Sequence, residues 1–507
     1  MFKMQQGFAR SGLIILLLIA AAVVILFLLP TPKPDAASVA ATTTSTTTAD
    51  ADCLAVPADF STPSVVAATP PASLWEGWSY GNAIMLTATP VAALVDESVT
   101  IRVSGLKPNE PITLRASLSD YMHRAYSAEV TYLADSNGVV DVTRDAPKYG
   151  SYSGVHAMGL IWSMLPENLA NPNTVFYAPP GDTFPIQLQA LADGRVLTQT
   201  SLIRNLMAPG VKKTIVNTNG LVGELYTPAT PGPHPAVMVL GGSEGGSYPQ
   251  VNEAALLASH GYTALGLAYF QGFQAGDPRL ASLPKMLTDI PLEYFAKAAD
   301  WLRQQPSVDP KHIAILGWSK GAEAALITAA TFPKDFKAVV TFMPGSAVWA
   351  GINYGPGPIT SSWTLHGKPL PWVNPVMNAS MFSTGKPLVF LGAYQNGLKD
   401  AAAFKKAVIP VENIAGPILL ISATDDQIWP SPLMAHQIMQ RRAAHHVAYQ
   451  DESLCYIGAG HGILPPWRPT NATVAGIVAF GGNPVAYAFA DQDAWSKVLT
   501  FLHESLR

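Results

Sequence analysis

A strand, a tight turn and a helix follow one another around Ser319, and this combination constrains the fold more than any other part of the chain. Residues 312–316 predict a buried strand and residues 322–327 predict a helix. Between them stands the GxSxG sequence Gly317-Trp318-Ser319-Lys320-Gly321. Glycines permit a sharp turn that lifts the serine hydroxyl to the edge of a sheet. We interpret it as a nucleophile elbow; the alternative is an ordinary strand-to-helix turn.

Composition and charge bear on the number of domains and exclude some classes of function. The chain has 507 residues, 49% of them hydrophobic and 13% charged, which is enough for more than one domain. The net charge of −4 argues against nucleic acid as a partner. Cys53 and Cys455 are too few for a disulfide framework or a CxxC metal site. One bridge between them can form outside the cytoplasm, but we expect two unrelated free thiols. No cofactor and no metal ion are predicted.

The N-terminus predicts a membrane segment. Lys3 and Arg10 precede an uncharged run at residues 11–29, which is about long enough to span a bilayer as a helix. We interpret residues 1–30 as an uncleaved signal anchor, with a cleaved signal peptide as the alternative. The positive-inside rule then places the globular part outside the cytoplasm, in the periplasm or at the cell surface.

Three further segments follow. Residues 31–72 are rich in Pro, Ala, Ser and Thr and predict a disordered linker. Short alternating runs separated by turn sequences predict a β-sandwich over residues 73–208. Over residues 209–507 apolar strands alternate with helices, which predicts a largely parallel sheet covered on both faces. The strand runs of the sandwich are residues 99–103, 112–118, 129–133 and 184–191.

The second domain supplies the partners that a serine nucleophile needs, a base and an acid. A buried strand at residues 417–422 leads into Asp425 and Asp426, and His461 follows in a glycine-rich loop. The order serine, acid, histidine is that of an α/β-hydrolase. Periodicity does not choose between the two aspartates.

A glycine-rich loop after the predicted strand at residues 236–240 completes the candidate site. In hydrolases of this fold such a loop donates one backbone N–H to an oxyanion hole, here from Gly242 or Ser243, and the residue after the nucleophile, Lys320, donates another. A phosphate-binding loop is the alternative, but the stretch lacks both GxGxxG spacing and a GK[ST] ending.

These motifs together resemble the acyl-CoA thioesterase and bile acid-CoA:amino acid N-acyltransferase family, from about residue 88 to residue 506. The resemblance implies an α/β-hydrolase fold preceded by an all-β sandwich domain, to which we add the N-terminal membrane-spanning helix. Alignment on Trp429 implies that Asp426 is the catalytic acid, with Asp425 as the fallback. The matching segments are residues 96–99, 103–108, 154–164, 317–323, 425–431, 460–466 and 480–482.

The resemblance also implies a reaction. The amidating branch of that family resembles a cysteine enzyme, so Ser319 favours hydrolysis of a fatty acyl thioester through an acyl-enzyme intermediate. The predicted substrate is acyl-CoA or another acyl thioester or ester. Because the chain is predicted to be exported, a carboxylesterase or acyltransferase acting on an extracytoplasmic acyl ester is one alternative. A non-enzymatic exported binding module is the other.

A cap is predicted over the site at residues 349–382, which are rich in Gly, Pro, Ser and Trp. Trp363 and Trp372 lie in this segment. We expect them to belong to a packed cap core, and the alternative is that they line an acyl tunnel.

Overall fold

The computed structural model describes residues 53–57, 69–81, 83–167, 175–179, 182–248, 250–353, 357–382, 386–471 and 473–507. The predicted anchor at residues 1–30 and most of the predicted linker lie outside these ranges. Within them, no helix combines the length and apolar character needed to cross a membrane.

The first domain is a β-sandwich built from a seven-stranded and a three-stranded sheet. The predicted strands at residues 112–118 and 184–191 are present as β4 and β9, which pair antiparallel. Alternate residues along β3 and β5 are buried, as expected for strands with one face on a core. The three-stranded sheet contains β1 (Met85–Thr89), β3 (Thr100–Ser104) and β6 (Val140–Asp141), and the larger sheet β2 (Ala92–Leu94), β4 (Pro111–Ser119), β5 (Ala125–Leu133), β7 (Tyr149–Gly150), β8 (Leu165–Pro166), β9 (Thr183–Ala192) and β10 (Arg195–Asn205).

The second domain is built on an eight-stranded sheet in the order β11-β12-β14-β13-β16-β17-β20-β21. The pairs β11–β12 and β12–β14 are antiparallel, and the remaining neighbours are parallel. Every residue of β14, β17 and β20 is buried, as parallel strands covered on both faces require. This is an α/β-hydrolase fold. Its strands are β11 (Lys212–Thr218), β12 (Leu221–Thr227), β13 (His234–Leu240), β14 (Thr263–Ala268), β16 (Val308–Trp318), β17 (Ala338–Phe342), β20 (Ile418–Ala423) and β21 (Glu452–Tyr456).

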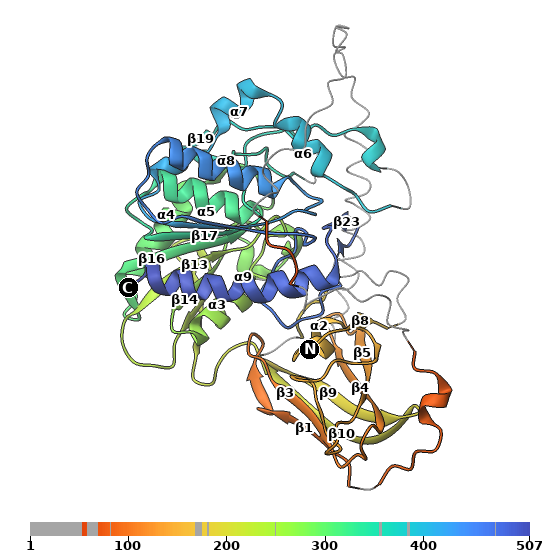
Figure 1. The fold of residues 1–507 in the computed structure, drawn as a ribbon. Coiled ribbons are helices and arrows are strands. Elements are labelled where there is room, and N and C mark those ends of the chain that lie inside the picture. The colour runs from red at the N-terminus through yellow and green to blue at the C-terminus, as the bar shows by residue number, and fades with distance from the viewer. Residues whose placement is uncertain are drawn as a thin grey trace.

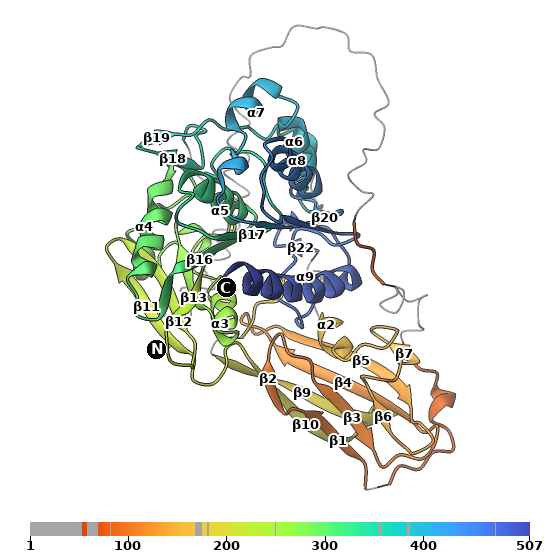
Figure 2. The ribbon, with the colours of Figure 1, turned by 60° about the vertical axis from the view of Figure 1, so that its left-hand side comes forward.

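Helices cover both faces of this sheet (Figure 1). Helices α4, α5 and α8 pack into the core on one face, and α3 and α9 pack into the core on the other. Figures 1 and 2 show α9 running between the sheet and the β-sandwich. The helix bounds are α2 (Gly159–Trp162), α3 (Gln250–Ser259), α4 (Leu292–Arg303), α5 (Lys320–Thr331), α6 (Leu391–Gly397), α7 (Ala401–Ala407), α8 (Ser431–Ala444) and α9 (Pro484–Ser505).

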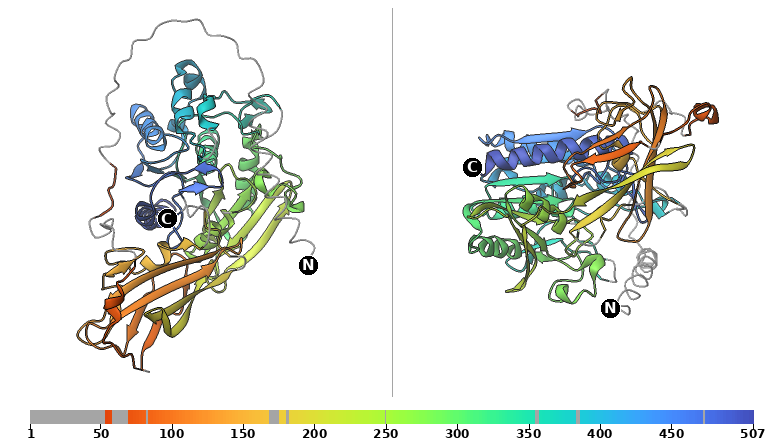
Figure 3. Two further views of the ribbon diagram at one scale, coloured as in Figure 1. Left: turned by 90° about the vertical axis from the view of Figure 1, so that its right-hand side faces the viewer. Right: turned by 90° about the horizontal axis from the view of Figure 1, so that it is seen from below.

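A long excursion between β17 and β20 contains the predicted cap segment and lies at the opposite end of the molecule from the sandwich (Figure 3, left). It contributes α6, α7 and two short strands to that end. The remaining elements are β15 (Ile290–Pro291), β18 (Trp363–Leu365), β19 (Lys368–Pro369), β22 (Val474–Ala475), β23 (Val478–Ala479) and the 3-10 helices η3 (Ala72–Trp75), η4 (Gly272–Gln274), η5 (Pro278–Leu280), η6 (Ala379–Phe382) and η7 (Val411–Asn413).

The prediction of two free thiols is wrong, because Cys53 and Cys455 form a disulfide. Residues 53–57 run beside the edge strand β21: Leu54 N–H donates to Cys455 O (2.6 Å), and Ile457 N–H donates to Leu54 O (2.9 Å). This pairing brings together two cysteines that lie 402 residues apart in the sequence. Nothing in their sequence surroundings indicates that proximity.

Asp96 links the sandwich to the second domain through hydrogen bonds. Its carboxylate accepts hydrogen bonds from His260 Nε2 (2.6 Å), just after α3, and from Trp495 Nε1 of α9 (2.8 Å). Ala488 of α9 also packs into the sandwich core. Burial lowers the pKa of His260, but the hydrogen bond and charge of Asp96 outweigh this and leave that pKa raised. One carboxylate therefore joins two helices of the second domain to the first.

We expect Asp96→Asn to lower the free energy of unfolding by about 1.5–3 kcal/mol at pH 6, because it removes hydrogen bonds to a charged group. Since His260 has a raised pKa in the folded state, its stabilising charge is fully present below its unfolded pKa and is lost as pH rises through the folded pKa. The cost of the substitution should therefore be smaller at pH 9, where the bond from Trp495 remains. Denaturant unfolding at both pH values measures this. Asp309→Asn, which removes the partner of His312 within one domain, is the control.

Candidate active site

Ser319 stands in a sharp turn between β16 and α5, with a φ of 53°. The flanking glycines are required by close backbone approach. A Cβ on Gly317 would lie 2.2 Å from the carbonyl oxygen of Gly321, and one on Gly321 would lie 2.2 Å from the carbonyl oxygen of Gly241. The GxSxG sequence therefore forms the strained strand–turn–helix of a nucleophile elbow.

The structure brings together the predicted serine, histidine and second aspartate. Ser319 Oγ lies 2.8 Å from His461 Nε2, and His461 Nδ1 lies 2.9 Å from both carboxylate oxygens of Asp426. His461 and Asp426 are buried, whereas Ser319 is partly exposed. With Nδ1–H donating to Asp426, Nε2 is left to accept the serine proton.

The two adjacent aspartates have different partners. Asp426 accepts the N–H groups of Ile428 (2.9 Å) and Trp429 (3.1 Å) and the Ser431 hydroxyl (2.7 Å), so its carboxylate is held facing His461. In the part of the chain that the structure describes, no hydrogen bond joins Asp425 to the imidazole. Asp425 accepts the Gly482 N–H instead (2.8 Å).

Asp425 nevertheless contributes to the position of the histidine. The turn that it holds through Gly482 contains Phe480, whose carbonyl oxygen accepts the His461 N–H (2.9 Å). The nucleophile strand contributes from the other side, because Trp318 Nε1 donates to Ile463 O (3.0 Å). The His461 loop is therefore tied to both β16 and the 480–482 turn.

Residues 241–246, here called the glycine loop, pack directly against the elbow. A Cβ on Gly242 would lie 3.3 Å from the Cβ of Ser319. The Gly242 N–H is not free, because it donates to Glu244 Oε1 (2.7 Å). Lys320 is the first residue of α5, and an N–H at that position has no acceptor within its own helix. Gly242 and Lys320 thus lie beside Ser319, and Ser243 follows Gly242 in the glycine loop.

Tyr269, at the end of β14, orients the glycine loop. Its hydroxyl donates to Gly241 O (2.7 Å) and lies 3.1 Å from Gly242 O. In a trans peptide the N–H points away from the carbonyl. Holding these two carbonyls on one side therefore turns the N–H groups of Gly242 and Ser243 to the other side. Tyr269 is fully buried within the core, so this orientation is fixed by packing.

The loop at residues 270–279, which follows β14, supports the glycine loop. Phe273 N–H donates to Glu244 O (2.8 Å), and Gly246 N–H donates to Phe270 O (2.8 Å). The side chain of Gln274 accepts the Ser247 N–H (3.2 Å). The two loops therefore hold each other along their backbones.

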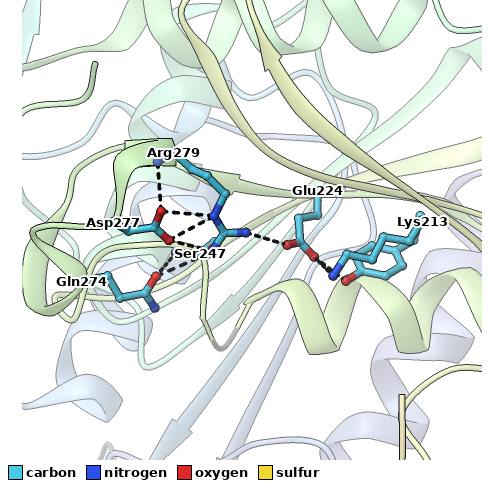
Figure 4. Close-up of polar contacts among 7 residues, drawn as sticks. Lys213, Glu224, Ser247, Gln274, Asp277 and Arg279 are labelled. Carbon is cyan, nitrogen blue, oxygen red and sulfur yellow. Dashed lines mark hydrogen bonds and ion pairs between the residues drawn. The ribbon is translucent and has the colours of Figure 1, made fainter. Parts of the chain in front are cut away.

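A chain of ion pairs fixes the far end of the 270–279 loop (Figure 4). Arg279 pairs with Asp277 (2.7 Å) and, more loosely, with Glu224 of β12 (3.4 Å). Glu224 also pairs with Lys213 of β11 (2.7 Å). The loop is therefore tied to the antiparallel edge of the sheet.

Glu323 connects the nucleophile helix to the cap segment. Its carboxylate pairs with Lys320 Nζ (2.6 Å) and accepts the Trp349 N–H (3.0 Å) and the Trp363 indole N–H (2.7 Å). Lys320 and Glu323 are both buried. The cap is thus joined by charge-assisted hydrogen bonds to the helix that follows Ser319.

The two cap tryptophans belong to a packed core. Trp363 is fully buried in the main cluster of the second domain, and the partly buried Trp372 packs against that cluster. Trp349 and Trp429 form a further cluster, and Trp429 lies edge-on to His461 with ring centroids 5.7 Å apart. Trp429 follows β20 and is not part of the cap, and it links the cap residue Trp349 to the surroundings of His461.

Over the part of the chain that the structure describes, no three His, Cys, Asp or Glu side chains gather in a group that could hold a metal ion.

Three family models match the chain. The C-terminal model of BAAT and acyl-CoA thioester hydrolases covers residues 290–507, and the N-terminal region of the same family covers residues 96–218. The dienelactone hydrolase family model covers residues 221–356. Mitochondrial acyl-coenzyme A thioesterase 2 of Mus musculus is 31% identical over 440 residues, which are 85% of this chain and 91% of that protein. The chain belongs to the acyl-CoA thioesterase and BAAT family. It is accordingly a hydrolase of this family, as its motifs implied.

Another relative matches a similar share of the chain. Human acyl-coenzyme A thioesterase 6 is 31% identical over 423 residues, which are 81% of this chain and 94% of that protein. Solved structures similar to the chain include a dienelactone hydrolase-like promiscuous phosphotriesterase from metagenomic libraries, at 18% identity and a TM-score of 0.35 over 59% of this chain and 98% of that one. A puromycin-hydrolyzing peptidase of Mycobacterium tuberculosis has 13% identity and a TM-score of 0.40 over 82% of this chain and 66% of that one.

The prediction of a membrane-anchored, extracytoplasmic globular part is wrong on these findings. The thioesterase 2 relative is named as mitochondrial, and no helix in the described ranges is long and apolar enough to cross a membrane. The prediction relied on residues 11–29, which lie outside the described part of the chain.

Sequence reasoning missed Tyr269 and Glu244, which both act on the backbone of the glycine loop. Glu244 lies inside the Gly-rich stretch, and its position beside Ser319 gave no periodic signal. Tyr269 follows a fully buried strand and resembles any other core aromatic residue. Only contacts between segments distant in sequence identify either one.

We expect Tyr269→Phe to lower kcat about 10-fold with little change in KM, because the peptides that it orients carry the predicted oxyanion donors, which would act on charge that develops in the transition state. Steady-state kinetics on an acyl thioester measures this. Tyr294→Phe is the matched control, since the Tyr294 hydroxyl also donates to a backbone carbonyl, that of Ala268 (2.6 Å). An equal loss of kcat in both variants would show that Tyr269 has no special role.

Proposed function

We propose that the chain is a serine acyl-CoA thioesterase that uses Ser319 as nucleophile, His461 as base and Asp426 as the acid that orients the histidine. The observation that carries this proposal is the continuous hydrogen-bonded series from Ser319 Oγ to His461 to Asp426, with spacings of 2.8 and 2.9 Å. Membership of a family whose curated relatives are named acyl-coenzyme A thioesterases supports the substrate class.

Acylation begins when Ser319 Oγ attacks the thioester carbonyl carbon and its proton passes to His461 Nε2. The N–H of Lys320 and an N–H of the glycine loop, from Gly242 or Ser243, stabilise the oxyanion. The C–S bond then breaks, and the imidazolium gives its proton to the departing thiolate. Asp426 stays ionised and stabilises the positive charge on the histidine.

Deacylation repeats these steps with water. His461 takes a proton from water, which attacks the acyl carbon on Ser319, and the proton returns to Ser319 as the ester bond breaks. The products are a carboxylic acid and a thiol. A serine nucleophile, rather than a cysteine, favours hydrolysis over transfer to an amino acid. Assays of the full chain on acyl-CoAs of graded length and on simple esters, with and without glycine, test both the leaving group and the acceptor.

We expect Ser319→Ala and His461→Ala each to lower kcat about 10⁴-fold or more. Both variants should keep the thermal transition of the parent, because neither residue is part of the hydrophobic core. Ser422→Ala, at a buried serine of β20 that bonds only to backbone, is the matched control. Substantial activity in either site variant would refute the mechanism.

The two aspartates give a second test. We expect Asp426→Asn to lower kcat about 10⁴-fold, because an amide in its place favours the wrong imidazole tautomer. Asp425→Asn should cost far less, since the asparagine oxygen can still accept the Gly482 N–H. Comparing kcat of the two variants on one substrate decides the assignment, and the opposite order of losses would transfer the acid role to Asp425.

A further inference from the structure

Glu244 is an ionisable residue beside the nucleophile that the proposed reaction leaves without a role. It lies in the glycine loop and is partly exposed, as Ser319 is. Its Oε1 accepts the Gly242 N–H (2.7 Å). A Cβ on Gly242 would lie 2.9 Å from Glu244 Oε2 and 3.3 Å from Ser319 Cβ. The carboxylate and the serine are therefore close neighbours across a single glycine.

The position of this carboxylate is fixed by its surroundings. The Glu244 carbonyl accepts the Phe273 N–H (2.8 Å). The next residue, Gly245, has a φ of 68°, and a Cβ there would lie 2.7 Å from the ring of Phe270. Only glycine fits that conformation and that space, so the turn that directs the Glu244 side chain toward Gly242 is built into the loop.

Glu244 and His461 interact electrostatically. Burial raises the pKa of the Glu244 carboxyl, while the Gly242 N–H and positive charge on His461 lower it. A carboxylate near an imidazole favours the protonated form of the imidazole. Tyr177, Tyr269 and Glu253 are also influenced by this carboxylate, and none of these three is cationic. His461 is a neighbouring group that becomes a cation in the proposed reaction.

We propose that Glu244 is a positioning residue for the hydrolytic reaction, whose carboxylate holds the Gly242 N–H and stabilises the imidazolium that His461 becomes when Ser319 attacks. This inference rests on the proposed function. It also indicates which N–H of the glycine loop stabilises the oxyanion. The Gly242 N–H already donates to Glu244. The Gly242 carbonyl is held near Tyr269, which turns the Ser243 N–H of the same peptide to the other side. The Ser243 N–H and the Lys320 N–H are therefore the two donors to the oxyanion.

The test is the pH dependence of kcat/KM for Glu244→Gln in the full chain. Glutamine keeps the size and an acceptor for Gly242 but loses the charge. Without the anion, the histidine binds its proton less tightly. We therefore expect the acid limb to move about one unit to lower pH, and the plateau to fall about tenfold. An unchanged acid limb would overturn the electrostatic part of the inference.

Glu244→Ala removes the acceptor as well as the charge, so its plateau should fall further than that of Glu244→Gln. Equal losses would overturn the role of the hydrogen bond. If the alanine variant does not fold, the glutamine variant still decides the electrostatic part.

Glu110→Gln is the matched control. Glu110 is a buried glutamate of the sandwich that accepts the Lys107 N–H (2.8 Å), as Glu244 accepts that of Gly242. Its substitution should leave the acid limb in place, and an equal shift would overturn the inference.

Labelling by a fluorophosphonate, located by mass spectrometry, separates this inference from the proposed function. No labelling of Ser319 in the parent chain would count against the proposed function itself. Labelling at Ser319 together with an unshifted Glu244→Gln profile would overturn the role of Glu244 alone.

Discussion

Gly321 stands against the glycine loop so closely that a Cβ there would lie 2.2 Å from the carbonyl oxygen of Gly241. This contact sets how near the nucleophile turn can come to the loop that follows β13. It places Ser319 beside Gly242, so the attacking oxygen and the candidate oxyanion donors share one small region. A larger residue at Gly321 would force helix and loop apart, and the proposed geometry for acyl transfer would be lost with it.

Around this contact, side chains from distant segments hold backbone groups in place. Tyr269 binds carbonyls of the glycine loop, Trp318 binds a carbonyl of the His461 loop, and Asp425 binds the turn that contacts the histidine backbone. Such an arrangement suits a site that acts by electrostatic stabilisation, because dipoles fixed before the reaction need not reorganise during it. In the proposed mechanism these residues hold the backbone groups beside Ser319, His461 and Asp426 in position.

The sandwich and the cap are joined to the hydrolase domain through different carboxylates. The sandwich is joined through Asp96, which binds His260, just after α3, and Trp495 of α9, so the segment at residues 96–99 has a structural role between domains. The cap is joined through Glu323, which lies one turn along the helix from Ser319 and binds Trp349 and Trp363. Displacement of the cap would therefore act on the helix that carries Lys320, the proposed oxyanion donor.

The sequence by itself determined the elbow, the α/β-hydrolase sheet and the family, because these depend on local periodicity and on glycines required by short-range backbone contacts. It also named Ser319, Asp426 and His461 as candidates, but it left Asp425 open until a family resemblance was used. Only the tertiary structure decided which aspartate faces the histidine, that Cys53 reaches Cys455, and that Tyr269 and Glu244 act on the glycine loop. Each of these depends on the packing of segments far apart in the chain, and pairwise proximity of that kind leaves no periodic trace in a single sequence.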